Sequence, residues 1–251
     1  MQNGIELSKD IFIYNTGYCL NDIKNALPNQ KSKKIKFNSK IIYIKNSKLK
    51  NVLIDTGYSN YINELDNIKV KIHNFITPIN LIKFDFFKLK PDIIILSHFH
   101  IDHIGGLFNY KKIPIICSKE AYLNCLNSRG FNKLKTGFIK ELLPSDFDQR
   151  VIFIEDLKKV KPFFGFDKVY EYKEFKFINL EGHAKGQYGV VYKDLFYVAD
   201  AYWQKENLIY NMMPRKLTKI IHDNYEEYEK TLNKLHNIYI KNKYKMVATH
   251  D

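Results

Sequence analysis

The sequence has few cysteines and no long hydrophobic run. Its 251 residues contain three cysteines, and no two of them form a C-x-x-C pair. This usage argues against a disulfide framework or a zinc knuckle and indicates reduced thiols in a cytoplasmic protein. No apolar stretch approaches the roughly 18–20 residues of a membrane span, so we expect no membrane association. The N-terminus also lacks the basic start and apolar stretch of a secretory signal.

Acidic residues are outnumbered by basic ones. The chain has 27 Asp and Glu against 40 Lys and Arg, which gives a net charge of +13 and a pI of about 9.3. Such an excess can indicate a nucleic-acid partner. However, the lysines are spread along the whole chain, which favours a coding bias. We therefore expect a small-molecule substrate, acidic or neutral, rather than nucleic acid. The sequence leaves the oligomeric state open.

The length and the absence of a composition shift predict one domain over residues 1–251. Residues 128–172 are the least regular part, and we interpret them as an insertion or cap that contributes substrate contacts. Apolar alternation and turn residues predict the strands, and Ser118 is the predicted N-cap of a helix over residues 118–127. Residues 217–239 have the spacing of an amphipathic helix. Strands are predicted at residues 11–14, 40–45, 51–54, 93–97, 113–117, 175–179, 189–192, 195–198 and 246–249.

Residues 98–103, with the sequence His-Phe-His-Ile-Asp-His, hold four potential metal ligands directly after a buried strand. In extended chain the side chains of His98 and His100 point to the same face. Asp102 and His103 come just past the bend, so they can face a second point. One short segment could therefore serve two neighbouring metal ions.

Further ligand types follow later strands: His183, Asp200 and His250 each come where a predicted strand has just ended. Imidazole and carboxylate donors suit Zn²⁺, Mn²⁺ or Fe, and the lack of a nearby thiolate argues against a closed structural zinc site. Seven ligands are too many for one tetrahedral ion. They fit two ions about 3.5–4 Å apart that share a carboxylate and a bridging hydroxide, which is hydrolase chemistry.

The ordered set of these motifs, with residues 53–57 (Leu-Ile-Asp-Thr-Gly) upstream, resembles the metallo-β-lactamase superfamily. The resemblance runs from about residue 40 to the C-terminus and implies an α/β fold, a four-layer αβ/βα sandwich with the metals at one edge. It implies that Asp55 supports the site from behind. The ligand assignment that it implies is His98, His100 and His183 on one zinc, Asp102, His103 and His250 on the other, and Asp200 bridging.

Among the branches of that superfamily, the sequence most resembles the N-acyl homoserine lactonases. Where that branch has a tyrosine three residues after the bridging aspartate, this chain has Trp203, with Tyr202 one residue earlier. We therefore predict that Tyr202 helps to stabilise the oxyanion. The resemblance implies that Asp102 passes a proton to the leaving group. Lys185 replaces the usual proline after the His183 motif and faces either a substrate carboxylate or solvent.

The predicted activity is therefore hydrolysis of a small ester, lactone or thioester at a dinuclear zinc site. Two alternatives use the same ligands. One is a phosphodiesterase or ribonuclease, and the other is a non-hydrolytic iron-loaded oxygenase or a metal sensor. Fold alone does not choose among these activities.

Overall fold

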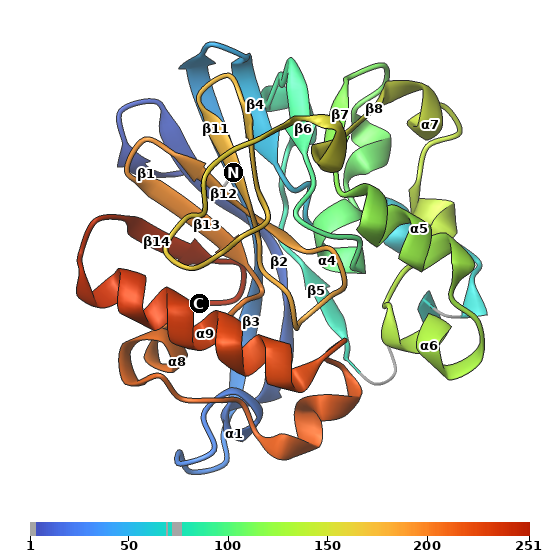
Figure 1. The fold of residues 1–251 in the computed structure, drawn as a ribbon. Helices are drawn as coiled ribbons and strands as arrows, with labels where there is room; N and C mark the ends of the chain where they lie inside the picture. Colours follow the sequence, from blue (N-terminus) through green and yellow to red (C-terminus); the bar gives the residue numbers. More distant parts are fainter. Residues whose placement is uncertain (1–3, 69, 72–76) are drawn as a thin grey trace.

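Two β-sheets pack face to face, and helices cover their outer sides (Figure 1). The computed structural model describes residues 4–68, 70–71 and 77–251. The larger sheet has the strand order β1-β2-β3-β4-β6-β7-β8, with β5 beside β2. Its strands are β1 (Ile5–Ser8), β2 (Ile11–Asp22), β3 (Lys34–Ser47), β4 (Lys50–Ile54), β5 (Ile79–Leu81), β6 (Ile93–Ile95), β7 (Ile115–Cys117) and β8 (Val151–Phe153).

The second sheet has the order β14-β13-β12-β11-β10-β9, and both sheets mix parallel with antiparallel pairs. Its strands are β9 (Lys158–Lys159), β10 (Val169–Tyr172), β11 (Phe175–Asn179), β12 (Tyr188–Tyr192), β13 (Leu195–Ala199) and β14 (Lys245–Ala248). The described α-helices are α1 (Ile23–Ala26), α2 (Tyr61–Glu64), α4 (Ile101–Ile104), α5 (Lys119–Asn127), α6 (Gly130–Lys135), α7 (Phe147–Arg150), α8 (Lys205–Tyr210) and α9 (Tyr225–Ile240).

Three layers of buried apolar side chains hold this arrangement together. The central layer lies between the sheets and includes Ile54, Ile95 and Phe177. Outside it, α5 packs on the larger sheet, and α9 packs through Leu232 and Leu235 on the smaller one. These contacts confirm the four-layer α/β sandwich that the sequence predicted, and Figure 1 shows α5 and α9 on opposite sides of it.

The structure bears out most predicted strands and extends several of them. The hairpin β3–β4 and the hairpin β12–β13 lie where alternation placed them, and Ser118 Oγ accepts from the backbone N–H of Ala121 at the start of α5. Strands β2 and β3 run well beyond the predicted segments, since their ends pair with each other as far as Asp22 and Lys34. This long ribbon reaches the site described below.

Two predicted boundaries need correction. The C-terminal helix begins at Tyr225 rather than at residue 217, because the Asn224 side chain accepts the free backbone N–H groups of Glu226 and Glu227 and caps it. Leu217 and Ile221 lie outside this helix and are exposed. The predicted cap over residues 128–172 is also too long, since β8, β9 and β10 belong to the two sheets.

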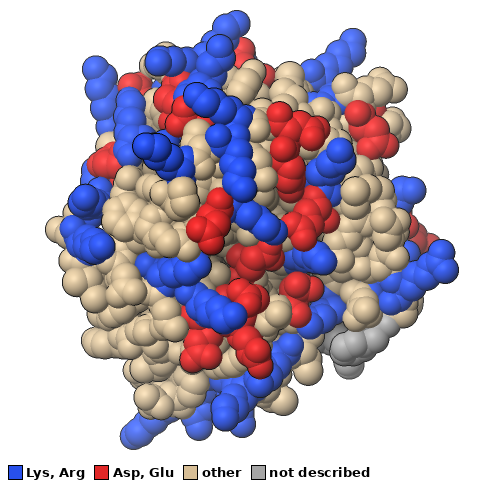
Figure 2. Space-filling view, viewed as in Figure 1, with Lys and Arg blue, Asp and Glu red and all other residues tan. Residues whose placement is uncertain are grey.

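The surface carries both signs of charge. Figure 2 shows acidic side chains gathered along the middle of one face, with Lys and Arg around and between them. Among the described helices, none has the length and apolar composition needed to cross a membrane.

Candidate metal centre

The predicted ligands come from several chain segments that meet at one end of the two sheets. His98 and His100 lie in the loop after β6, and the first turn of α4 carries Asp102 and His103. The other three residues follow strands of the smaller sheet: His183 comes after β11, Asp200 directly after β13, and His250 after β14. Because several strand ends point to the same edge, residues far apart in the chain become neighbours.

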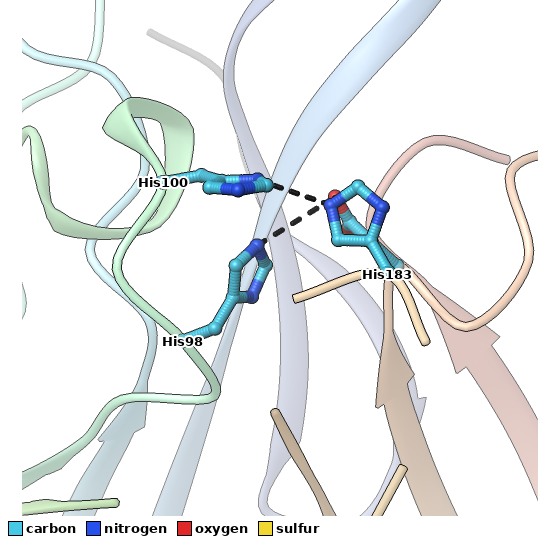
Figure 3. Close-up of side chains that lie close together, drawn as sticks. His98, His100 and His183 are labelled. Atoms are coloured by element: carbon cyan, nitrogen blue, oxygen red, sulfur yellow. Dashed lines mark hydrogen bonds and ion pairs between the residues drawn. The ribbon is translucent and has the colours of Figure 1, made fainter. Parts of the chain in front are cut away.

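One group of donors consists of His98, His100, His183 and Asp200, whose ligand atoms all lie within 4.8 Å of one another. Figure 3 shows the three imidazole rings converging. His183 Nε2 lies 3.0 Å from His100 Nδ1 and 3.2 Å from Asp200 Oδ2, and His98 Nε2 lies 3.9 Å from the same oxygen. Three imidazoles and a carboxylate around one point are a suitable donor set for zinc.

A second group contains Asp102, Asp200 and His250, again with ligand atoms within 4.8 Å. His250 Nε2 lies 3.1 Å from Asp200 Oδ2 and 3.8 Å from Asp102 Oδ2. His103 faces the same carboxylates, since its Nε2 is 3.4 Å from Asp102 Oδ2 and 3.3 Å from Asp200 Oδ1. Asp200 therefore stands between the two groups, as a bridging ligand would.

The buried donor atoms fit metal ions better than they fit one another. Within the described part of the chain, His98 Nε2, His103 Nε2 and Asp200 Oδ1 are buried and have no hydrogen-bond partner. Burying such atoms unpaired is costly, so native proteins rarely do it without a ligand or an ion. A metal site would explain why these three buried donor atoms lack hydrogen-bond partners.

The pKa values differ among the predicted histidine ligands. Burial, together with the neighbouring imidazoles, holds the pKa of His98 well below its usual value and lowers the pKa of His100 to about 3. These rings are therefore neutral, the form that binds a metal. Despite burial, Asp102 and Asp200 hold the pKa of His103 well above its usual value, and Asp200 raises the pKa of His250 to about 8. A metal ion would have to displace protons from these last two rings. Burial opposes the charge of Asp200, but His250 and His103 outweigh it and hold the pKa of this carboxyl well below its usual range.

A comparison with protein families now identifies the fold. The sequence profile described as "Metallo-beta-lactamase superfamily" matches residues 36–237. The chain belongs to this superfamily. No curated protein matches the chain in sequence.

Solved structures of the superfamily share the fold at low sequence identity. A mutant of B. thuringiensis AiiA with N-decanoyl-L-homoserine bound is 17% identical, with a TM-score of 0.71 over 96% of this chain and 92% of that one. AidC, described as a dizinc quorum-quenching lactonase, is 19% identical, with a TM-score of 0.67 and coverages of 99% and 90%. A probable metal-dependent hydrolase from Staphylococcus aureus is 16% identical, with a TM-score of 0.69 and coverages of 100% and 91%.

Asp55 lies behind the metal centre, as its resemblance to a superfamily residue implied. It follows β4 in a left-handed conformation, with φ 57°. Its buried carboxylate accepts hydrogen bonds from the backbone N–H and the hydroxyl of Ser97, from His103 Nδ1 at 2.7 Å and from the Tyr197 hydroxyl at 2.7 Å. Because a carboxylate only accepts, the proton of a neutral His103 is held on Nδ1, which would leave Nε2 free for a metal ion.

Two other contacts fix ligands in place. His250 Nδ1 lies 2.7 Å from the carbonyl oxygen of Asn38 on β3, so the long β2–β3 ribbon orients this ring. Gly182, before His183, has φ 123°, and an added Cβ would lie 2.2 Å from the backbone nitrogen of Tyr228. Only glycine allows the close approach of α9 that places His183.

A cavity of about 460 Å³ opens beside both donor groups. Its walls are mainly apolar and include Phe37, Phe138, Ile139, Trp203 and Ile221. His100, Asp102, His183, Asp200 and His250 also line it. From the segment predicted as a cap, Lys133, Lys135, Gly137, Phe138 and Ile139 line this cavity.

The predicted role of Tyr202 does not agree with its position. Its side chain is fully buried in the apolar cluster with Leu208 and Leu232, and its hydroxyl has no hydrogen-bond partner of normal geometry among the described residues. The next residue, Trp203, lines the cavity instead. The two neighbouring aromatic side chains therefore have different surroundings, Tyr202 in the apolar cluster and Trp203 at the cavity.

Trp203 has a neighbour that nothing in the sequence singled out. His222 is completely buried, and its ring stacks on Trp203 with a centroid distance of 5.0 Å and an interplanar angle of 17°. Burial and the nearby His183 lower the pKa of His222 to about 2, so the ring is neutral. A histidine far along the chain with no motif around it carries no sequence signal of such a contact.

Proposed function

We propose that the protein is a dinuclear metal-dependent hydrolase that cleaves a small ester, lactone or thioester. One observation carries the proposal: two groups of buried donors share Asp200 and face a cavity with apolar walls. Zinc is the metal that we propose, with Mn²⁺ or Fe as alternatives. Two metals bound there would lower the pKa of a coordinated water and polarise the carbonyl of the substrate.

The protein side chains contribute orientation and proton transfer. Asp102 lines the cavity, and despite burial His103 keeps the pKa of its carboxyl below the usual range, so it is ionised at neutral pH. We propose that it takes a proton from the attacking water and passes it to the leaving oxygen or sulfur. Trp203 and Phe138 offer an apolar surface for the acyl group and exclude water from it.

The apolar walls favour acyl substrates over a phosphodiester. A nucleic-acid backbone is bound through many cationic groups, whereas this cavity offers two, Lys133 and Lys135, within walls that are mainly apolar. The lactonase structures with similar folds are described with acyl homoserines bound, which agrees with a small acyl substrate.

The test is an activity panel on protein reconstituted with Zn²⁺. The panel contains acyl homoserine lactones, aryl esters, acyl thioesters and bis(4-nitrophenyl) phosphate. We expect turnover of at least one acyl substrate, slow cleavage of the phosphodiester, and loss of both metal and activity in His98→Ala. His236→Gln is the matched control because this histidine lies on α9 and contacts the Leu208 carbonyl oxygen. Faster cleavage of the phosphodiester than of every acyl substrate would overturn the assignment.

A further inference from the structure

A second, more polar cavity shares His100 and His183 with the apolar one. Its volume is about 230 Å³, and Asn124, Ser128, Asn132 and Thr136 contribute side chains to its wall. His98, His100 and His183 line it as well. Predicted metal ligands therefore line both an apolar cavity and a polar one.

Lys135, the last residue of α6, lines both cavities. Its ammonium group donates to the carbonyl oxygen of Asp223 at 2.8 Å, and the backbone N–H of Asp223 donates to the carbonyl oxygen of His183 at 2.9 Å. Asp223 thus connects Lys135 to the predicted metal ligand His183 through two hydrogen bonds. Since Lys has three donors, two of them remain for another acceptor.

No carboxylate neutralises Lys135 within ion-pair distance in the part of the chain that the structure describes. Lys185, which also lines the polar cavity, differs because Glu120 lies 3.9 Å from its ammonium group. The remaining charged side chains that line the two cavities are Lys133, Asp102, Asp200 and Asp223. Asp102 and Asp200 belong to the metal centre, and Asp223 contacts Lys135 through its backbone oxygen rather than through an ion pair of its carboxylate. Lys135 is therefore a partly buried cation that forms no ion pair with the described residues.

We infer that the substrate is an amphiphilic anion, in which an apolar acyl group is joined through the scissile bond to a part that carries a carboxylate or a phosphate. The acyl group occupies the apolar cavity, and the anionic part lies on the polar side, where Lys135 binds it. The inference rests on the proposed function for the bond that is cleaved, but the anion site follows from Lys135 and the two cavities. Lys135 is then a specificity-determining residue.

The activity test compares two thioesters that differ in one charge. S-hexanoyl-3-mercaptopropionate is anionic, and S-hexanoyl-N-acetylcysteamine is neutral. Hydrolysis adds water to the carbonyl carbon, breaks the C–S bond and releases the thiol and hexanoic acid, which ionises to hexanoate and a proton, in both cases. A hydrogen bond to a charged group predicts that Lys135→Met lowers kcat/KM about tenfold or more for the anionic thioester and less than about twofold for the neutral one.

The controls separate charge from structure. Lys135→Arg keeps the cation and should restore most of the preference for the anion. Lys140→Met removes an exposed lysine from the neighbouring segment that lines neither cavity, and it should behave as the wild type. Equal losses on both thioesters in Lys135→Met would overturn the inference.

A binding test separates failure of the anion site from failure of the proposed reaction. Calorimetry on the zinc-loaded full chain measures three thioethers that cannot be hydrolysed: 3-(hexylthio)propanoate, 2-(hexylthio)ethyl phosphate and 3-(hexylthio)propan-1-ol. Lys135→Met should weaken at least one anion about tenfold and the alcohol less than about twofold, and the anion affected more identifies the group. If binding follows this pattern but no thioester is cleaved, the anion site stands and the acyl hydrolase proposal fails. Unchanged binding of both anions would refute the inference.

Discussion

Replacement of Asp55 by asparagine is a sharp test of how the structure prepares a metal ligand. Asparagine has nearly the same shape as aspartate and tolerates the left-handed backbone at this position, where φ is 57°. The substitution therefore changes hydrogen bonding and charge but not packing. Its effect depends on which groups around the carboxylate can reverse their roles.

The backbone N–H of Ser97 can only donate, so in Asp55→Asn the oxygen of the new side-chain amide must face it. The NH₂ of this amide then faces His103 Nδ1, which lies 2.7 Å from Asp55 Oδ2 in the wild type. To accept this hydrogen bond, His103 must move its proton to Nε2. A protonated Nε2 cannot bind a metal, so zinc binding by His103 must break the new hydrogen bond.

Loss of such a supporting contact typically costs about 10- to 100-fold in metal affinity. We also expect the free energy of unfolding to fall by about 2–4 kcal/mol, because charged hydrogen bonds become neutral or are lost. Competition with a zinc-binding dye measures the affinity of each site, and urea denaturation of the metal-free protein measures stability. The zinc that His103 binds should be the one that is weakened.

Tyr197→Phe is the matched control for Asp55→Asn. It removes the hydrogen bond of the Tyr197 hydroxyl to Asp55 Oδ2 but leaves the contact between Asp55 and His103. We expect a stability loss of about 1 kcal/mol and zinc affinities within about threefold of the wild type. If Asp55→Asn also keeps both affinities within about threefold, the reasoning about the His103 tautomer is refuted.

Three further substitutions test the site and its surroundings. Tyr202→Phe should leave kcat/KM within about twofold and stability unchanged or raised by up to ~1 kcal/mol, because the buried hydroxyl has no hydrogen-bond partner of normal geometry among the described residues. A large loss of kcat would restore the oxyanion role. Trp203→Leu should lower kcat/KM about fivefold more for a hexanoyl substrate than for its acetyl analogue. The reason is that the substitution removes apolar contact with the longer acyl chain that contributes about 1 kcal/mol of binding free energy. Equal effects on both chain lengths would contradict an acyl subsite. Gly182→Ala should destabilise the protein by about 3 kcal/mol in urea denaturation, because the new Cβ would meet the backbone of Tyr228; a normal stability would contradict the close packing of α9.

Much of the fold could be read from local patterns. Alternation and turn residues located the hairpins of both sheets, and Ser118 marked the start of α5. Periodicity failed at residue 217, because apolar spacing continues through a segment that Asn224 separates from α9. Irregular composition also concealed β8, β9 and β10, whose pairing depends on partners far along the chain.

The predicted ligands were accessible to sequence reasoning because each follows a strand, and strand ends in a sandwich meet at an edge. The surroundings of the site were less accessible. Which of Tyr202 and Trp203 faces the cavity depends on the path of a few residues after Asp200, and the stacking of His222 on Trp203 depends on tertiary packing alone. Lys135 stood in a segment of many lysines, and only the two cavities distinguish it.

The central claim is that the seven residues bind two metal ions that share Asp200. A crystal of the zinc-loaded protein, measured on both sides of the zinc absorption edge, tests it most directly. We predict two anomalous peaks about 3.5–4 Å apart, one bound by His98, His100 and His183, the other by Asp102, His103 and His250, with Asp200 touching both. A single peak at saturating zinc, or a second peak away from Asp200, would contradict the account.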